Sequence, residues 1–245
     1  MSGHSKWKNI MHKKEKTDAQ RAKIFTKVGR EIAVIVKEGG PDPNSNTKLK
    51  DVIAKAKSLN VPNDNIERII KKASGGDGSV EYMQMLYEGY GPNGVAVLVE
   101  TLSDNKNRIA ADMRHYFDKY GGNLGTSGSV SWQFEEKGIL VVELSELDED
   151  KLLEDILDSD AKDYSSDGEI YEIFTLPESF GDVRDHLSAK GYSFLEAELS
   201  LIPSTYVDLT DEDDIKKMRR LLELLDDNDD VQRVSHNWGN EPQED

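Results

Sequence analysis

Apolar residues recur every three or four positions in three stretches of the first 75 residues, which is the period of an amphipathic helix. The first stretch follows residues 17–20 (TDAQ), which have the form of a helix capping box, and it ends at Gly39 and Gly40. The second covers residues 49–59, and the third begins after Pro62. Three such helices can bury one small core, so this pattern predicts a three-helix domain at the N-terminus.

After residue 80 the apolar runs shorten to strand length and alternate with helical stretches. The pattern predicts helices over residues 109–120, 147–157, 177–190 and 215–225, and strands over residues 82–90, 95–102, 130–134, 139–144, 161–165, 169–176, 194–202, 206–209 and 231–238. Residues 139–202 thereby follow the order strand, helix, strand, strand, helix, strand, which is the ferredoxin-like order.

The same pattern predicts how the domains are arranged along the chain. Residues 80–136 supply only part of a second α/β domain, and the last stretch of the chain can add the missing elements. We therefore predict a multidomain α and β protein, in which an N-terminal three-helix domain is followed by two ferredoxin-like α/β domains, one inserted in the other. The predicted domains are residues 1–79, residues 80–136 together with 203–245, and the inserted residues 137–202.

The composition narrows the chemistry and the compartment. The 245-residue chain has no cysteine, which excludes disulfides, thiolate metal sites and thiol catalysis. Its longest apolar runs, 32–36 and 95–99, have five residues each, whereas a helix that crosses a bilayer needs about 20. The N-terminus lacks the apolar stretch of a secretory signal. We expect a cytoplasmic protein with no membrane partner.

Charge is distributed unevenly in this chain, whose formal net charge is -17. Residues 1–75 hold 17 Lys+Arg and 8 Asp+Glu, whereas residues 76–245 hold 14 Lys+Arg and 40 Asp+Glu. Such asymmetry indicates an end of the chain that binds a polyanion, and nucleic acid is the expected partner. The alternative is that the lysines only keep the helix surfaces soluble.

Residues 4–16 (HSKWKNIMHKKEK) form a basic arm ahead of the first helix. Trp7 in this arm can stack on an unpaired base, or it can pack against the protein's own surface. Together with the basic faces of the helices, the arm makes up the predicted nucleic-acid-binding surface. Its residues are Lys6, Trp7, Lys8, Lys13, Lys14, Lys16, Arg21, Lys23, Lys27 and Arg30, flanked by Lys55, Lys57, Lys71 and Lys72.

Signatures of catalysis are missing from the sequence. There is no phosphate-binding loop of the Gly-x-x-x-x-Gly-Lys-Ser/Thr type and no Gly-x-Ser-x-Gly nucleophile elbow, and the five histidines are dispersed. The glycine-rich residues 121–129 suit a turn better than a nucleotide cradle. The acidic run 226–230 lacks the glycine and the terminal glutamate of a calcium loop, so we expect a solvated turn. We expect no catalytic residues, metal, cofactor or small-molecule substrate, and an enzyme acting on nucleotides is the less favoured alternative.

Six motifs give the chain a specific resemblance. They are GHSKWKNI (3–10), GGPDPNSN (39–46), NVPNDNIER (60–68), YEGYGPNGVAV (87–97), GGNLGTSGSVSW (121–132) and DDVQRVSHN (229–237). In their order and spacing the chain resembles the YebC family, which includes the mitochondrial translational activator of cytochrome oxidase subunit I. The resemblance covers nearly the whole chain.

The resemblance implies three domains with a helical N-terminal domain, and a role that is not enzymatic. Bacterial members of the family are described as transcriptional regulators that bind DNA, while mitochondrial and some bacterial relatives are described as translation factors that act at the ribosome. Two partners therefore remain open, namely DNA and the ribosomal RNA of the ribosome. The helices show no clear set of Asn, Arg and Gln side chains for reading base edges, which favours contacts to the backbone or to RNA.

Overall fold

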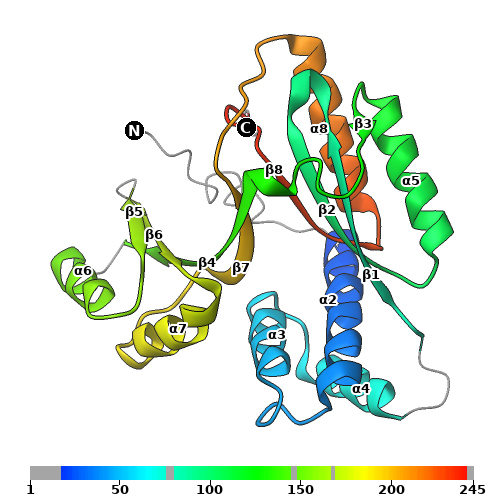
Figure 1. Cartoon of the computed structure of the whole chain (residues 1–245). Coiled ribbons are helices and arrows are strands. Elements are labelled where there is room, and N and C mark those ends of the chain that lie inside the picture. The colour runs from blue at the N-terminus through cyan, green and yellow to red at the C-terminus, as the bar shows by residue number, and fades with distance from the viewer. Residues whose placement is uncertain (1–17, 76–79, 145–147, 167–168, 242–245) are drawn as a thin grey trace. The chain divides into compact units, whose positions relative to one another are not determined.

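The computed structural model describes residues 18–75, 80–144, 148–166 and 169–241, with side chains from residue 21 onward (Figure 1). Thr17 of the expected capping box lies outside the described residues, as does the whole basic arm with Lys6, Trp7, Lys8, Lys13, Lys14 and Lys16. Within the described residues, no helix is both long enough and apolar enough to span a bilayer.

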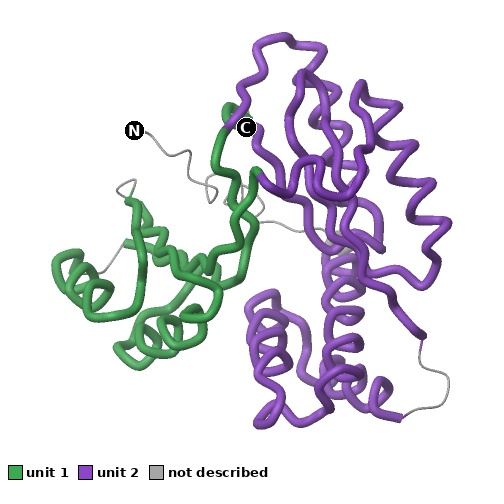
Figure 2. Tube along the Cα trace, viewed as in Figure 1, with its two compact units in different colours: residues 1–13, 133–205, 239–245 green, residues 14–132, 206–238 purple. Residues whose placement is uncertain are grey.

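The chain divides into two compact units (Figure 2). Of the described residues, the larger unit holds residues 18–132 and 206–238, and the smaller unit holds residues 133–205 and 239–241. The boundary expected between residues 79 and 80 lies inside the larger unit. The division into three domains at residues 79, 136 and 202 stays a prediction.

The helical part of the larger unit consists of α2 (Asp18–Gly39), α3 (Thr47–Ser58) and α4 (Asn63–Ser74). These helices share one core, in which Ile32, Leu49 and Ala56 are fully buried. Asn46 joins α2 to α3, because its side-chain oxygen accepts from the backbone N–H of Leu49 at 3.1 Å and its Nδ2 donates to the carbonyl of Ile35 at 3.1 Å. This side chain caps α3 at its N-terminus and explains the GGPDPNSN motif.

The remainder of the larger unit is a sheet covered by two helices. Strands β1 (Met83–Tyr90), β2 (Ala96–Ser103), β3 (Asn123–Leu124) and β8 (Val231–His236) form an antiparallel sheet in the order β3-β1-β2-β8. Apolar side chains of β2 pack against α5 (Lys106–Lys119) and α8 (Glu212–Asp227). Phe117 of α5 and Leu221 of α8 are fully buried in this core, as the helical spacing of the apolar residues predicts.

The structure contradicts two of the strands predicted for this sheet, at residues 130–134 and 206–209. Residues 130–134 do not form a strand of this sheet, because Ser131–Gln133 adopt a 3-10 turn and the next strand, β4 (Phe134–Glu143), belongs to the other sheet. Residues 206–209 contribute only a single bridge, from Val207 to Trp238, in place of a strand. In both cases the local apolar pattern suits a strand, but at residues 130 and 131 the backbone N–H groups donate to the Glu88 carboxylate.

The smaller unit is a four-stranded antiparallel sheet in the order β5-β6-β4-β7, with β5 (Asp163–Ser166), β6 (Ile170–Thr175) and β7 (Glu196–Pro203). The helices α6 (Glu149–Leu157) and α7 (Phe180–Ala189) pack on one face, where Leu152 and Leu187 are fully buried. The element order β4-α6-β5-β6-α7-β7 confirms the predicted ferredoxin-like order of this part of the chain.

Candidate nucleic-acid interface

The structure separates the predicted cations of the helical part into exposed and internally paired residues. Lys57 lies in the last turn of α3, and Lys71 and Lys72 lie in the last turn of α4. All three are exposed, and none of their side chains forms an ion pair or hydrogen bond within the described ranges. Arg21 is also exposed, at the start of α2. Within the described residues, Lys57, Lys71 and Lys72 therefore keep their charge available to a partner.

Lys55 belongs to the paired residues. Its Nζ lies 3.2 Å from Oε2 of Glu31, and the side chains are 28% and 32% exposed. This ion pair connects α3 to α2 within the helical part, so part of the charge of Lys55 is neutralised inside the protein.

Lys23, Lys27 and Arg30 are paired as well, and they share one face of α2 because they are spaced by four and three residues. The first turns of α2 lie beside the end of α8 and the start of β8 (Figure 1). Lys23 Nζ lies 2.5 Å from Oδ1 of Asp227. The hydrogen bond with Asp227 raises the pKa of Lys23, because it favours the charged ammonium.

The acidic turn, residues 226–230, receives this basic face. Lys27 donates to the carbonyl of Asp226 at 2.7 Å and lies 3.3 Å from its carboxylate. Arg30 donates to the carbonyl of Asp229 at 2.7 Å and to the carboxylate of Asp230. The expectation of a solvated turn is therefore only partly correct: Asp226 and Asp227 are exposed but end α8, Asp230 is buried, and the run of aspartates carries the contact with α2.

Asp230 is the buried centre of this contact, and its side chain is only 6% exposed. Its carboxylate also accepts from Arg108 Nη2 at 2.8 Å and from the Ser103 hydroxyl at 2.7 Å. Burial by itself would raise the pKa of Asp230, but the hydrogen bonds from Arg108, Ser103 and Arg30 outweigh it, so this pKa lies below its usual value. A buried carboxylate with this many charged and polar partners is costly to disrupt.

A second buried carboxylate, Glu88 on β1, organises the glycine-rich residues 121–131. Its two oxygens accept from the backbone N–H groups of Gly128 at 2.7 Å, Val130 at 2.9 Å and Ser131 at 2.8 Å. Burial alone would raise the pKa of Glu88, but these three donors outweigh it and lower the pKa. Because these three N–H groups already donate to the Glu88 carboxylate, they are not available to bind the phosphate of a nucleotide.

Sequence reasoning missed the roles of Glu88, Arg108 and Asp230. The role of Glu88 could have been inferred from the YEGYG motif, in which it stands between an aromatic residue and a glycine. A carboxylate buried in such a strand requires hydrogen-bond donors from elsewhere in the protein. The acid run at residues 226–230 and the basic face of α2 were complementary in charge. Nothing in the sequence indicated that these two segments meet.

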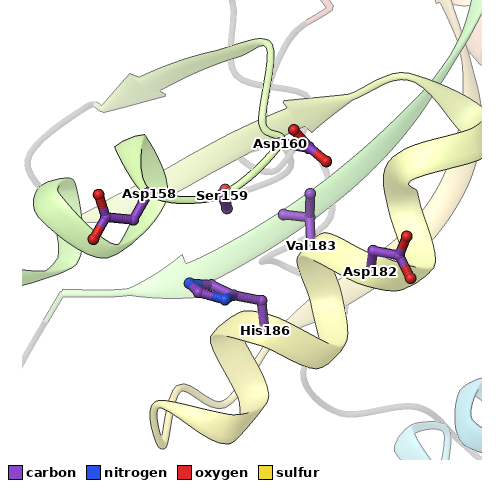
Figure 3. Close-up of a pocket in the computed structure, with 6 residues that line it drawn as sticks. All are labelled: Asp158, Ser159, Asp160, Asp182, Val183 and His186. Atoms are coloured by element: carbon purple, nitrogen blue, oxygen red, sulfur yellow. The ribbon is translucent and has the colours of Figure 1, made fainter.

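A shallow pocket of about 210 Å³ lies in the smaller unit (Figure 3). Asp158, Ser159 and Asp160 reach it from the connection between α6 and β5, and α7 supplies Asp182, Val183 and His186 (Figure 3). The Ser159 hydroxyl donates to the carbonyl of Ile156 at 2.6 Å, so it terminates α6 and is not paired with His186. Within the described residues, no group of carboxylates and histidines is arranged to hold a metal ion.

Taken together, the elements define a multidomain protein in which a basic helical part precedes two sheet-containing parts rich in acidic residues. Comparison with known sequences then gives the family. The sequence model of the TACO1/YebC N-terminal domain matches residues 5–76, and that of the TACO1/YebC second and third domain matches residues 82–238. The chain belongs to the TACO1/YebC family, which confirms the resemblance seen in its motifs.

Individual relatives match over nearly their full length. A protein of Acetivibrio thermocellus named "Probable transcriptional regulatory protein" is 56% identical over 97% of this chain and 99% of its own length. A protein of Finegoldia magna with the same name is 54% identical over 98% of this chain and 100% of its own length. The crystal structure of a conserved hypothetical protein from Aquifex aeolicus is 42% identical, covers 94% of each chain and superposes with a TM-score of 0.83.

Proposed function

We propose that this protein is a non-enzymatic regulator of gene expression in the cytoplasm, which binds nucleic acid through its basic N-terminal part. The observation that carries the proposal is the set of exposed lysines Lys57, Lys71 and Lys72, which have no ion pair with any described residue, in a chain whose remainder is strongly acidic. These three lysines form the open part of the binding surface, and the lysines of the basic arm, which precede the described residues, are proposed to add to it. The names of the relatives support DNA as the partner and transcription as the process.

The chemistry of this surface also supports a second partner, ribosomal RNA, bound by the same face in a translation factor. Lysine is a compact point charge that contacts phosphate without reading bases. Arg30, which has the planar fork suited to guanine, is engaged with Asp230 and with the carbonyls of Leu102 and Asp229. The open cations therefore favour recognition of a phosphate backbone, which DNA and ribosomal RNA share.

Binding is tested with the full chain and labelled probes. Fluorescence anisotropy with a 16-base-pair DNA duplex and with a ribosomal RNA fragment, each at several salt concentrations, should show affinity that falls steeply as salt rises. Each phosphate contact should contribute a slope of about 0.9 in log K against log salt on duplex DNA, or about 0.7 on a single strand. No binding to either probe at low salt would refute the proposal.

The physiological partner is tested by crosslinking in cells and sequencing the nucleic acid that is recovered. Enrichment of promoter DNA would establish the transcriptional role, whereas enrichment of ribosomal RNA at defined positions would establish the role in translation. Recovery of neither above the background of an untagged strain would contradict both.

A further inference from the structure

The face of α2 that carries Lys23, Lys27 and Arg30 is the part of the basic surface that the protein itself occupies. Its three cations meet the carboxylates of Asp227, Asp226 and Asp230 in turn. Carboxylates and phosphates both have anionic oxygens that accept hydrogen bonds from the lysine ammonium. The aspartates therefore present to this face the same kind of acceptor that a nucleic-acid backbone carries.

Solvent reaches the two outer contacts from the side of their aspartates, since the side chains of Lys23 and Lys27 are 35% and 15% exposed. The side chains of Asp227 and Asp226 are 64% and 71% exposed, whereas that of Asp230 is 6% exposed. Ion pairs with an exposed partner are weak and are screened by salt, so a dense polyanion can displace them. The inner contact of Arg30 with Asp230 is also held by Arg108 and Ser103 and resists such displacement.

The position of the outer aspartates within α8 points in the same direction. Asp226 and Asp227 are the last two residues of this helix, and its last turn contains no basic residue. Carboxylates there face the negative end of the helix dipole, which disfavours them. Their presence is unfavourable for α8 itself, so their benefit comes from outside the helix, where Lys23 and Lys27 lie.

We propose that the acidic turn is an internal competitor of nucleic acid for α2, held to Lys23 and Lys27 in the free protein and displaced from them when a polyanion binds. This inference rests on the proposed function. The pair of Arg30 and Asp230 stays formed and keeps α2 attached while the outer pairs exchange. Breaking the outer ion pairs costs free energy, so a polyanion of low charge density binds α2 less tightly than it would without the aspartates. Conversely, a bound polyanion favours the state in which the outer pairs are open, and that state binds the polyanion more tightly.

Neutralising the two outer aspartates tests the competition. In D226N/D227N neutral amides compete less well than carboxylates for Lys23 and Lys27, although Lys27 keeps its 2.7 Å bond to the backbone carbonyl of residue 226. The full chain should therefore bind the 16-base-pair duplex and the ribosomal RNA fragment about five- to tenfold more tightly at low salt. The slope of log K against log salt should steepen by roughly 1 to 2, since two more lysines reach phosphates.

A matched control separates local competition from total charge. E212Q/D213N changes the net charge by the same amount at the opposite end of α8, where Asp213 pairs with Lys217 of the same helix at 2.6 Å. We expect this variant to change affinity less than about twofold, because it uncovers no lysine of α2. An affinity of D226N/D227N equal to that of the control, or weaker than that of the wild type, would overturn the inference.

The wild-type protein offers a test that needs no variant. A zero-length carbodiimide crosslink can join the Lys23 ammonium to the Asp227 carboxylate, which lie 2.5 Å apart, and mass spectrometry can quantify it. The yield of this crosslink should fall several-fold when the protein is saturated with the duplex, while the Lys217–Asp213 crosslink keeps its yield. An unchanged Lys23–Asp227 crosslink in the saturated protein contradicts the displacement.

Failure of the inference and failure of the proposed function give different results. If the wild type binds a probe but D226N/D227N behaves like the control, only the internal competition is refuted. If the wild type and both variants bind neither probe, the proposed function is refuted, and the competition with it.

Discussion

Arg30 in α2 and Asp230 next to β8 are separated by 200 positions in the chain, yet the guanidinium of one is bonded to the carboxylate of the other. The side chain of Arg30 is 16% exposed and that of Asp230 6%, so the pair is largely shielded from water. The same guanidinium lies 5.3 Å from the ring centre of Tyr82. This relationship fixes the helical part to the first sheet within the larger unit.

Replacing Asp230 should destabilise the protein strongly. In D230N the largely buried guanidinium of Arg30 and the half-exposed guanidinium of Arg108 lose their common partner, so we expect the free energy of unfolding to fall by about 3 kcal/mol. Urea denaturation at pH 7, followed by circular dichroism, measures this change. D118N, at an exposed position of α5, is the control and should change stability by less than about 0.5 kcal/mol. A loss below about 1 kcal/mol in D230N would mean that the contact adds little to stability.

Stability should depend on the carboxylate of Glu88 in a defined pH range. The pKa of Glu88 in the folded protein is lowered, so its stabilising effect is complete above the unfolded pKa of about 4.3 and is lost as the pH falls through the folded pKa. E88Q should lose about 2 kcal/mol at pH 7, because an amide can serve fewer of the three N–H donors. The difference between wild type and E88Q should shrink from pH 7 to pH 3, as urea midpoints would reveal. A constant difference over that range would rule out the charge of Glu88 as the source.

Gly122 should tolerate no side chain, for a reason that lies in the packing. A Cβ at this position would stand 2.3 Å from the carbonyl oxygen of Tyr90, which is backbone and cannot turn aside. G122A should therefore lower the free energy of unfolding by about 2 kcal/mol or more. In the control G181A, within α7, a Cβ meets nothing within 4 Å, and alanine should stabilise that helix by about 0.5 kcal/mol. Thermal unfolding of the two variants distinguishes them, and equal melting temperatures would contradict this account.

Reversing the exposed lysines should weaken binding to nucleic acid without unfolding the protein. K57E/K71E/K72E should bind the DNA duplex at least about tenfold more weakly and should lower the salt slope by roughly 2 to 3. K106E/K151E/K162E is the control, since it makes the same change of charge at exposed positions in the acidic part of the chain. Anisotropy titrations compare them. Equal weakening in both would assign the effect to net charge rather than to these three lysines.

Much of the fold followed from the apolar pattern. The three N-terminal helices and the ferredoxin-like order of the smaller unit could be predicted because each element carries its own periodicity and its own turn residues. The expected strand at residues 130–134 failed for a reason outside the local pattern. Glu88, more than 40 positions earlier, holds the N–H groups of Val130 and Ser131 that a strand would have used for pairing.

The candidate interface was only partly predictable. The sequence determined where positive charge is concentrated and which residues carry it, because charge and helical period are local properties. Only the tertiary structure decided which of those cations remain open. Lys23, Lys27 and Arg30 look like Lys57, Lys71 and Lys72 in the sequence, but folding places an acidic turn from the far end of the chain against the first three. Ion pairing depends on distance in space, and distance in space between such remote segments is set by how the cores pack.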